Sequence, residues 1–410
     1  IKAVLGPYQD LWQREILNSY PDTLQHYQER WIHTLSSLSD QQLFEIDAKL
    51  NLKHIKDSNL LELFENLESI TQLPKAKKSS DVKFLKKDFF KIKAKKQYEI
   101  KSIISALLLE SRTNNIENLI DIGGGKGHLS RIWCDYFSSR PFCIDENINL
   151  IVSGKTTPKT YFDQPRKEQI NFIHHKFPNQ NDIIKGVDKI FLSELFKGKI
   201  FTIGLHCCGG LSNGIIEASA RHKSSGILNF GCCYFKLDPS TELHISQYGN
   251  QNKMKLTTHA LTLATKAHTG LTYNDFLLKQ KVKSYRYTLH LYLYHEHNIK
   301  KFQEVGEAKH SLYAKEFNEY AKVKLDYLKI TKNISPNTLT YFFNDKKIKT
   351  LVKKMFLSNI IRWQFGRALE QYILIDRAIF LEEKGYDAHL KEFFDQTVSP
   401  RNIGIIAWLK

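Results

Sequence analysis

Three patterns of apolar and polar positions follow one another along the chain of 410 residues. In the first, segments such as YQDLWQREILNSY (8–20) and NLLELFENLESI (59–70) place apolar residues three and four positions apart. This spacing is typical of amphipathic helices. The polar segment PKAKKSSD (74–81), which has the composition of a linker, follows them. The pattern therefore predicts an N-terminal helical region over residues 1–80.

The second pattern consists of short apolar runs separated by segments with helical spacing. Strands that alternate with helices in this way are typical of a parallel, doubly wound α/β sheet. The runs are NLIDIG (118–123), RPFCID (140–145), INFIHHKF (170–177), IFTIGLH (200–206) and GILNFG (226–231). They predict a Rossmann-like core over residues 81–238.

In the third pattern, helical spacing returns and dominates residues 239–398, which we predict to be a mostly helical insertion. RYTLHLYLYH (286–295) fits a strand and a helix equally well. The apolar run IGIIAWL (403–409) lies near the end of the chain. It predicts that residues 399–410 add the last strand to the sheet of the core.

A glycine-rich segment, NLIDIGGGKGHLSRIW (118–133), follows the first predicted strand and leads into a helix. Asp121 precedes Gly123, Gly125 and Gly127, which permit a tight turn and let a ligand approach bare backbone. The N-terminus of the following helix would add amide donors and the positive end of its dipole. The segment therefore predicts a cofactor-binding loop.

Three ligands compete for this loop. A phosphate-binding loop of the GxxxxGK[ST] type is excluded because the Lys-Ser/Thr pair is missing. A dinucleotide fold needs GxGxxG, whereas this loop has Gly-x-Gly-x-Gly after an acidic residue, which favours S-adenosylmethionine (SAM). A carboxylate at the end of the second strand would bind the ribose. Asp145 stands there, and Glu146 is its competitor.

Two cysteine doublets, Cys207–Cys208 and Cys232–Cys233, follow the fourth and fifth predicted strands. Ligands bind at the carboxyl ends of strands in such sheets, so the doublets are expected at the rim of the methyl-transfer cleft. A zinc site is disfavoured because adjacent residues on extended backbone point to opposite sides. A catalytic thiol and a vicinal disulfide are further alternatives, disfavoured by sequence context and by a reducing compartment. We expect a structural role, with His206 and Tyr234 as polar groups.

Several segments together resemble the methyltransferase-like 25 group, which includes proteins named for a ribosomal RNA adenine dimethylase domain. They are NLIDIGGGKGHLSR (118–131), LHCCGGLS (205–212), NFGCCYFKL (229–237), KAKKQYEI (93–100), ALEQYILIDRAIFLEEKGY (368–386) and SPRN (399–402). The resemblance covers most of the chain. It implies a class I SAM-dependent methyltransferase fold, with SAM contacted by Asp121, Asp145 and the loop glycines.

The chain departs from the pattern of that group at three positions. Gly210 replaces an acidic residue, Cys207 replaces a threonine, and Phe235 takes a position that resembles histidine in the group. If the missing carboxylate acts as a base, this chain lacks it. The N-[LI]-P-[FY] motif by which adenine dimethylases hold a flipped base is also absent from LHCC.

The composition bears on partners and compartment. The formal net charge is +17, which favours polyanions such as RNA or a ribosomal particle, although codon bias in an AT-rich genome would raise lysine everywhere. Eight lysines and several aromatics lie between Lys83 and Lys101, which suits phosphates and stacked bases or the solvated face of a helix. Six cysteines, no apolar run of membrane-spanning length and no signal-peptide pattern lead us to expect a cytoplasmic protein.

These observations lead to one expected function and two alternatives. The expected function is SAM-dependent methyl transfer to RNA or to a ribosome-associated protein. In this hypothesis His206, Cys207, Cys232, Cys233 and Tyr234 face the acceptor, and no metal takes part. The first alternative is a SAM-binding, non-catalytic assembly factor that docks on RNA. The second, nicotinamide-linked reduction, is disfavoured by the glycine spacing.

Overall fold

The computed structural model describes residues 1–410 except 50, 86–88, 157–169, 267–270 and 331–333. Contacts between residues divide the chain into two compact units. Unit 1 contains residues 1–70 and 269–368, and unit 2 contains residues 71–268 and 369–410. Each unit therefore combines an early and a late part of the chain.

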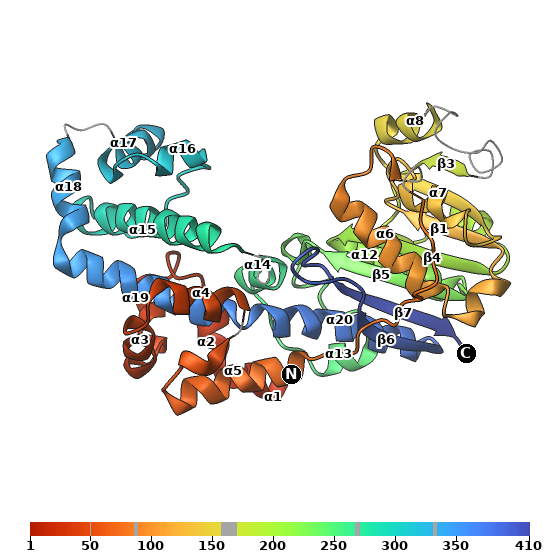
Figure 1. The fold of residues 1–410 in the computed structure, drawn as a ribbon, viewed down its shortest axis with the longest axis horizontal. Helices are drawn as coiled ribbons and strands as arrows, with labels where there is room; N and C mark the ends of the chain where they lie inside the picture. Colours follow the sequence, from red (N-terminus) through yellow and green to blue (C-terminus); the bar gives the residue numbers. More distant parts are fainter. Residues whose placement is uncertain (50, 86–88, 157–169, 267–270, 331–333) are drawn as a thin grey trace. The chain divides into compact units, whose positions relative to one another are not determined.

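Unit 2 is built on a seven-stranded sheet with the strand order β3-β2-β1-β4-β5-β7-β6 (Figure 1). Strands β1 to β5 pair in parallel, and β7 runs antiparallel to its neighbours β5 and β6. The strands are β1 (Asn118–Ile122), β2 (Arg140–Asp145), β3 (Asn171–His174), β4 (Ile200–Cys208), β5 (Gly226–Cys232), β6 (Tyr386–Glu392) and β7 (Ile403–Leu409). This sheet confirms the predicted doubly wound, Rossmann-like fold.

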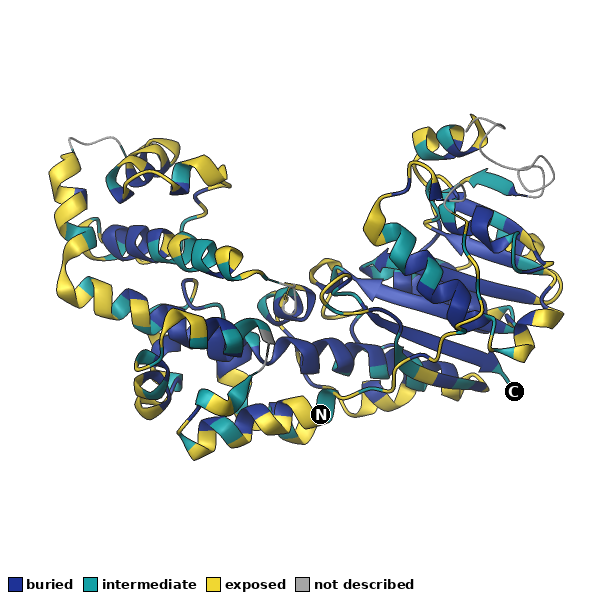
Figure 2. Ribbon diagram, in the orientation of Figure 1, coloured by how far each residue is buried: buried dark blue, intermediate teal, exposed yellow. Residues whose placement is uncertain are grey.

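Helices cover both faces of this sheet, which explains the near-continuous burial of the central strands (Figure 2). Apolar side chains of α6 (Ala94–Leu107) and α7 (His128–Trp133) pack on one face, where Trp133 stacks on Phe201 of β4. Side chains of α10 (Gln180–Ile184), α11 (Lys189–Leu195) and α12 (Gly210–Arg221) pack on the other face. The other α-helices among the described residues of this unit are α8 (Ile148–Thr156), α13 (Gln247–Gln251), α14 (Thr258–Lys266) and the C-terminal part of α20 (Gly366–Glu383).

Unit 1 is helical in its described residues. Its longest helix, α15, begins with a capping box between Thr272 and Asp275 and includes the ambiguous segment 286–295. Tyr285, Leu289 and Tyr292 are buried at helical spacing, so tertiary packing selects the helix there. The helices are α1 (Lys2–Leu5), α2 (Gln9–Trp12), α3 (Glu29–Ser36), α4 (Asp40–Lys49), α5 (Ser58–Thr71), α15 (Tyr273–Glu296), α16 (His310–Tyr313), α17 (Phe317–Tyr327), α18 (Pro336–Asn344) and α19 (Lys346–Trp363).

The predicted boundaries at residues 80, 238 and 398 differ from this division. Residues 239–268 and 369–398, which we expected within a helical insertion, group with the sheet of unit 2. Residues 386–392 form strand β6 instead of continuing a helix. β6 lies at the edge of the sheet and, among the named strands, pairs only with β7. Edge strands commonly carry charged and polar residues. In β6 these include His389 and Lys391, which interrupt the apolar pattern that would have predicted a strand.

Candidate functional site

The glycine loop lies between β1 and α7, at the carboxyl edge of the parallel strands. Gly123, Gly125 and Gly127 have φ values of +72°, +59° and +68°, which residues with a Cβ atom rarely adopt. The Gly123 amide donates to the Ile144 carbonyl at 2.8 Å, which ties the loop to the end of β2. The three predicted glycines therefore shape one tight turn.

Asp145, at the end of β2, faces this loop. Its Oδ2 accepts a hydrogen bond from the Gly125 amide at 2.9 Å, and its Oδ1 accepts one from the Asn147 amide at 2.8 Å. Each carboxylate oxygen keeps a further lone pair for a ligand. The neighbouring Glu146 lines a cavity beside the loop.

Asp121 lies beneath the loop and is 2% exposed. Ser130 Oγ of α7 donates to its Oδ2 at 2.7 Å. Burial raises the pKa of Asp121, although the hydrogen bond from Ser130 and the nearby Lys96 cation oppose the rise. A Cβ atom on Gly124 would lie 2.7 Å from Asp121 Oδ2, so this carboxylate and the loop backbone are closely packed. Asp121 therefore braces the loop from below.

The cavity beside the loop has a volume of about 570 Å³, and residues at or just after the ends of four parallel strands line it. Gly123, Asp145 and Cys208 line it. The segment Lys176–Asn179, which follows β3, lines it as well. Sequence reasoning missed this segment, although the rule that ligands bind at the carboxyl ends of strands applies to β3 as to the others.

His206 lies at a bulge in β4, where the pairing with β5 shifts register between Leu205 and Cys207. Its backbone has a φ of +66°. As a result Leu205 packs in the core on one face of the sheet and Cys207 in the core on the other, although they are only two positions apart. The bulge redirects the end of β4.

The His206 ring Nε2 lies 2.8 Å from Oε1 of Glu99, a residue of α6 that is 1% exposed. Ser399 Oγ donates to the same oxygen at 2.8 Å. Burial alone would raise the pKa of Glu99, but the contacts with His206 and Ser399 and the Lys96 cation together hold it below its usual value. Segments 93–100, 205–212 and 399–402, which are far apart in the sequence, thus meet in a single hydrogen-bonded cluster.

The other predicted acceptor-facing residues are largely buried. Cys207 is 1% exposed and Tyr234 is 3% exposed, and burial raises the pKa of both side chains. The Tyr234 hydroxyl donates to the Gly231 carbonyl at 3.1 Å and lies 3.3 Å from Glu370 Oε1. Of the two cysteine doublets, Cys208 is the member that lines the cavity among the described residues.

The cysteines do not follow the expectation that members of a doublet point apart. Cys208 Sγ lies 3.3 Å from Cys232 Sγ and 3.2 Å from Cys233 Sγ. The expectation was wrong for the second doublet because Cys233 has φ +52° and ψ +45° and is not on extended backbone. The left-handed turn places both of its thiols beside Cys208.

Glu242 is a further acidic group of the cavity that the sequence analysis did not identify. Its carboxylate occupies the space where a side chain on Gly210 would begin. Oε2 of Glu242 accepts a hydrogen bond from the Asp238 amide at 2.9 Å. A carboxylate therefore lies beside Gly210, a position that itself has no side chain.

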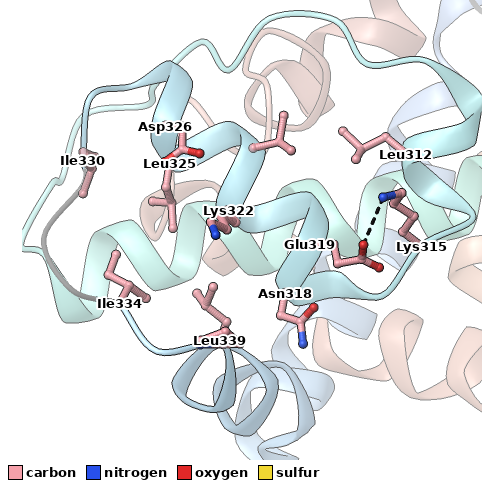
Figure 3. Close-up of a pocket in the computed structure, with 12 residues that line it drawn as sticks. Leu312, Lys315, Asn318, Glu319, Lys322, Leu325, Asp326, Ile330, Ile334 and Leu339 are labelled. Carbon is pink, nitrogen blue, oxygen red and sulfur yellow. Dashed lines mark hydrogen bonds and ion pairs between the residues drawn. The ribbon is translucent and has the colours of Figure 1, made fainter.

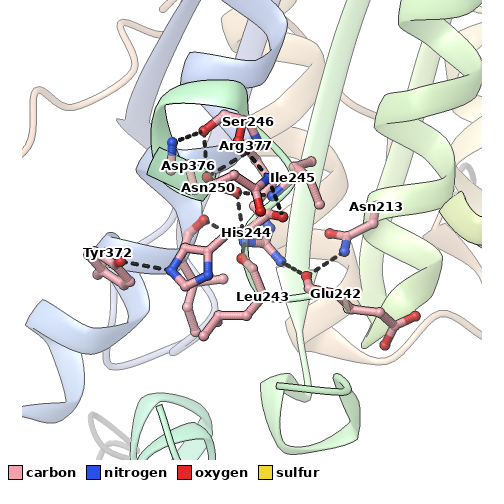
Figure 4. Close-up of polar contacts among 12 residues, drawn as sticks. Asn213, Glu242, Leu243, His244, Ile245, Ser246, Asn250, Tyr372, Asp376 and Arg377 are labelled. Carbon is pink, nitrogen blue, oxygen red and sulfur yellow. Dashed lines mark hydrogen bonds and ion pairs between the residues drawn. The ribbon is translucent and has the colours of Figure 1, made fainter. Parts of the chain in front are cut away.

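Helix α20 holds the segment that carries Glu242 (Figure 4). Arg377 donates from Nη2 to the Glu242 carbonyl at 2.9 Å and from Nη1 to the Leu243 carbonyl at 2.6 Å. Asp376 accepts from the Ile245 amide at 2.7 Å and from Ser246 Oγ at 2.6 Å. The DR pair of the 368–386 segment therefore positions one wall of the cavity.

Residues 92–240 match the family model described as a methyltransferase domain. The chain carries a methyltransferase domain. The matched segment contains the glycine loop, Asp145, Glu99 and both cysteine doublets. Residues Ser399, Arg377 and Glu242, which complete or position the site of this methyltransferase domain, lie beyond the matched segment.

The lysine-rich stretch is partly folded into the methyltransferase domain. Phe89 is buried, and Phe84 packs against the same core. The Lys101 Nζ lies over the Phe89 ring at 4.5 Å. The Phe84 and Phe89 rings therefore pack in the domain core, whereas Phe90 is 41% exposed and has Lys91 Nζ 5.3 Å from its ring centroid. Lys86 and Lys87 lie outside the described residues.

A separate cavity of about 590 Å³ lies in unit 1, between α17 and α18 (Figure 3). Apolar residues such as Leu325 and Leu339 line it together with an ion pair of 3.0 Å between Lys315 and Glu319. Among the described residues, no helix is long and apolar enough to span a membrane.

Proposed function

We propose that unit 2 transfers a methyl group from SAM to RNA. The observation that carries this proposal is the single cavity that joins the glycine loop and Asp145 to Cys208 and Glu242. The loop would hold the methionine part of SAM by its backbone, and the Asp145 carboxylate would accept the ribose hydroxyls. Phe177 and Pro178, which follow β3, would flank the adenine.

SAM would supply an electrophilic methyl group on its sulfonium, and the acceptor atom would displace it in line. The residues of the chain would mainly position the two reactants and exclude water. A base is needed only where the acceptor carries a proton. Glu242 is suited to that task because it lines the cavity and its carboxylate lies beside Gly210.

The choice of RNA as the acceptor is based on the charge of the protein. The net charge of +17 favours a polyanion, and exposed lysines such as Lys91, Lys93 and Lys95 precede or open α6. A ribosomal particle offers RNA and protein acceptors together. The alternative of a non-catalytic assembly factor is based on the lack of an acidic side chain at Gly210. The carboxylate of Glu242, which lies beside Gly210, weakens this argument.

The test is transfer of radiolabelled methyl groups from SAM into an extract of cells that lack this protein. We expect label that RNase removes and protease does not. Asp145→Ala should abolish transfer and SAM binding, whereas Glu194→Gln, an exposed carboxylate on α11, should change neither. Label removed by protease alone would identify a protein acceptor. SAM binding without any label would favour the non-catalytic assembly factor.

A further inference from the structure

Three thiols converge at the carboxyl edge of the sheet. The sulfur atoms of Cys208, Cys232 and Cys233 all lie within 4.8 Å of one another. Cys208 ends β4 and is paired in register with Cys232, which ends the neighbouring strand β5. The two strands thus place one sulfur from each beside the other, and the sheet fixes the backbone that holds them.

Cys233, which carries the third sulfur, has an unfavourable backbone conformation. Cys233 has a φ of +52°, a backbone region that residues with a Cβ atom rarely adopt. The turn brings its Sγ to 3.2 Å from Cys208 Sγ. A non-glycine residue held in this conformation, at the point where it completes a cluster of soft ligands, indicates a site whose geometry depends on the third thiol.

We propose that Cys208, Cys232 and Cys233 bind a thiophilic divalent cation, with Zn²⁺ as the fitting ion. Tetrahedral zinc sites have Zn–S bonds of about 2.3 Å, which place neighbouring sulfurs about 3.8 Å apart. The observed separations of 3.2 and 3.3 Å need to open by about 0.5 Å to reach that geometry. Rotation about the side-chain bonds supplies such a change.

Zinc binding would ionise the three thiols, because the metal ligand is the thiolate. Binding would replace three S–H protons by three metal–sulfur bonds, so that Zn²⁺ and three thiols give one zinc trithiolate of charge −1 and three protons.

The three thiols would leave a fourth coordination position to a ligand from outside the cluster. Among the residues that the structure describes, no further histidine, cysteine, aspartate or glutamate joins the group of three. Cys208 also lines the cavity that holds the glycine loop and Asp145. Three protein ligands with a fourth position left to water or to an entering acceptor atom are characteristic of zinc sites that take part in chemistry. The site is independent of whether RNA is the acceptor.

The test measures metal directly, on the full chain purified under reducing conditions without chelator. We expect about one zinc per chain by elemental mass spectrometry. Cys208→Ser and Cys233→Ser should each lower affinity by more than the ~10–100-fold that loss of an outer-shell partner costs. Cys134→Ser, a cysteine of α7's C-cap outside the cluster, should retain the metal.

A second readout uses Co²⁺ added to the metal-free chain. We expect near-ultraviolet thiolate-to-cobalt absorption and the visible bands of tetrahedral Co²⁺, lost in Cys208→Ser. Circular dichroism of each variant separates loss of metal from loss of fold. Zinc at the level of a protein without the cluster, with no cobalt bands, would overturn the proposal. So would a disulfide between Cys208 and Cys232 or Cys233 in peptides mapped from the reduced preparation. Neither readout depends on methyl transfer, so failure of this site and failure of the proposed function are distinguishable.

Discussion

The carboxylate of Glu242 occupies the space into which a side chain on Gly210 would project. The two residues are 32 positions apart in sequence, and Arg377 and Asn213 hold the segment that carries Glu242 by hydrogen bonds to the Glu242 carbonyl. Glycine at 210 therefore does not remove acidity from the cavity. It makes room for a carboxylate that comes from a different part of the chain.

Glu242→Gln should lower the rate of methyl transfer by about 100-fold or more if the carboxylate is the general base, while SAM affinity stays unchanged. Gly210→Ala should lower the rate as well, because the new methyl group displaces the carboxylate. Glu382→Gln, an exposed carboxylate on α20, is the matched control. Single-turnover kinetics with RNA from cells that lack the protein provide the measurement. An unchanged rate in Glu242→Gln would remove Glu242 from the chemistry.

Two glycines of the loop should differ in their tolerance of a methyl group. Gly125→Ala forces an alanine to φ +59° but adds only ordinary contacts, 3.7 Å from Leu150 and 3.9 Å from Asp145 Oδ2, so its cost is the strain of about 1–2 kcal/mol. Gly127→Ala adds a contact of 2.7 Å with the Phe172 ring, and overpacking of this kind costs a further ~1–3 kcal/mol. In urea denaturation, the free energy of unfolding of Gly127→Ala should therefore be lower than that of Gly125→Ala. Equal stabilities would show that the Phe172 ring moves aside without cost.

The glycine loop and Asp145 could be predicted from sequence because their geometry is local. A strand that ends in Gly-x-Gly-x-Gly must turn there, and the end of the next parallel strand must lie beside it. The structure accordingly places Asp145 in hydrogen-bond contact with Gly125. The strands were predictable for a similar reason, since runs of apolar residues that are buried on both faces have few other solutions.

The rest of the site could not be predicted because it depends on single backbone angles and distant segments. The argument that neighbouring cysteines point apart holds for extended backbone, and one left-handed residue, Cys233, breaks it. The bulge at His206 likewise moves Cys207 to the opposite face from Leu205. Glu242 and Ser399 reach the site through the tertiary fold, and no periodicity in the sequence connects them to it.

Stability of unit 1 should rise in mildly alkaline solution. Burial, together with the cations of Lys279, Arg286 and Arg362, lowers the pKa of Lys283 to about 8, although Glu15 opposes them. Between pH 8 and the ordinary lysine value of 10.5 the unfolded chain binds this proton and the folded unit does not. Folding is therefore increasingly favoured as the pH rises through this range. Lys283→Met should flatten that part of the pH profile, measured by urea denaturation followed by circular dichroism. A profile unchanged in the variant would contradict this assignment.

The Glu99–His206–Ser399 cluster should make unit 2 sensitive to acid. The pKa of Glu99 in the folded protein lies below its ordinary value of 4.5, despite burial, because of its hydrogen-bond partners. Its contribution to the free energy of unfolding is therefore complete above pH 4.5 and is lost as the pH falls through the lower, folded value. Glu99→Gln should reduce this loss, as measured by thermal unfolding between about pH 6 and pH 3.

His206→Ala should destabilise unit 2 by about 1–3 kcal/mol near neutral pH, because it leaves a buried carboxylate with one partner fewer. As the control for Glu99→Gln, the exposed Glu382→Gln variant should keep the acid sensitivity of the parent chain. If His206 only braces Glu99, SAM affinity at a temperature where the variant is folded will match the parent. A selective loss of methyl transfer in folded His206→Ala, with SAM bound normally, would instead give the imidazole a role in positioning the acceptor.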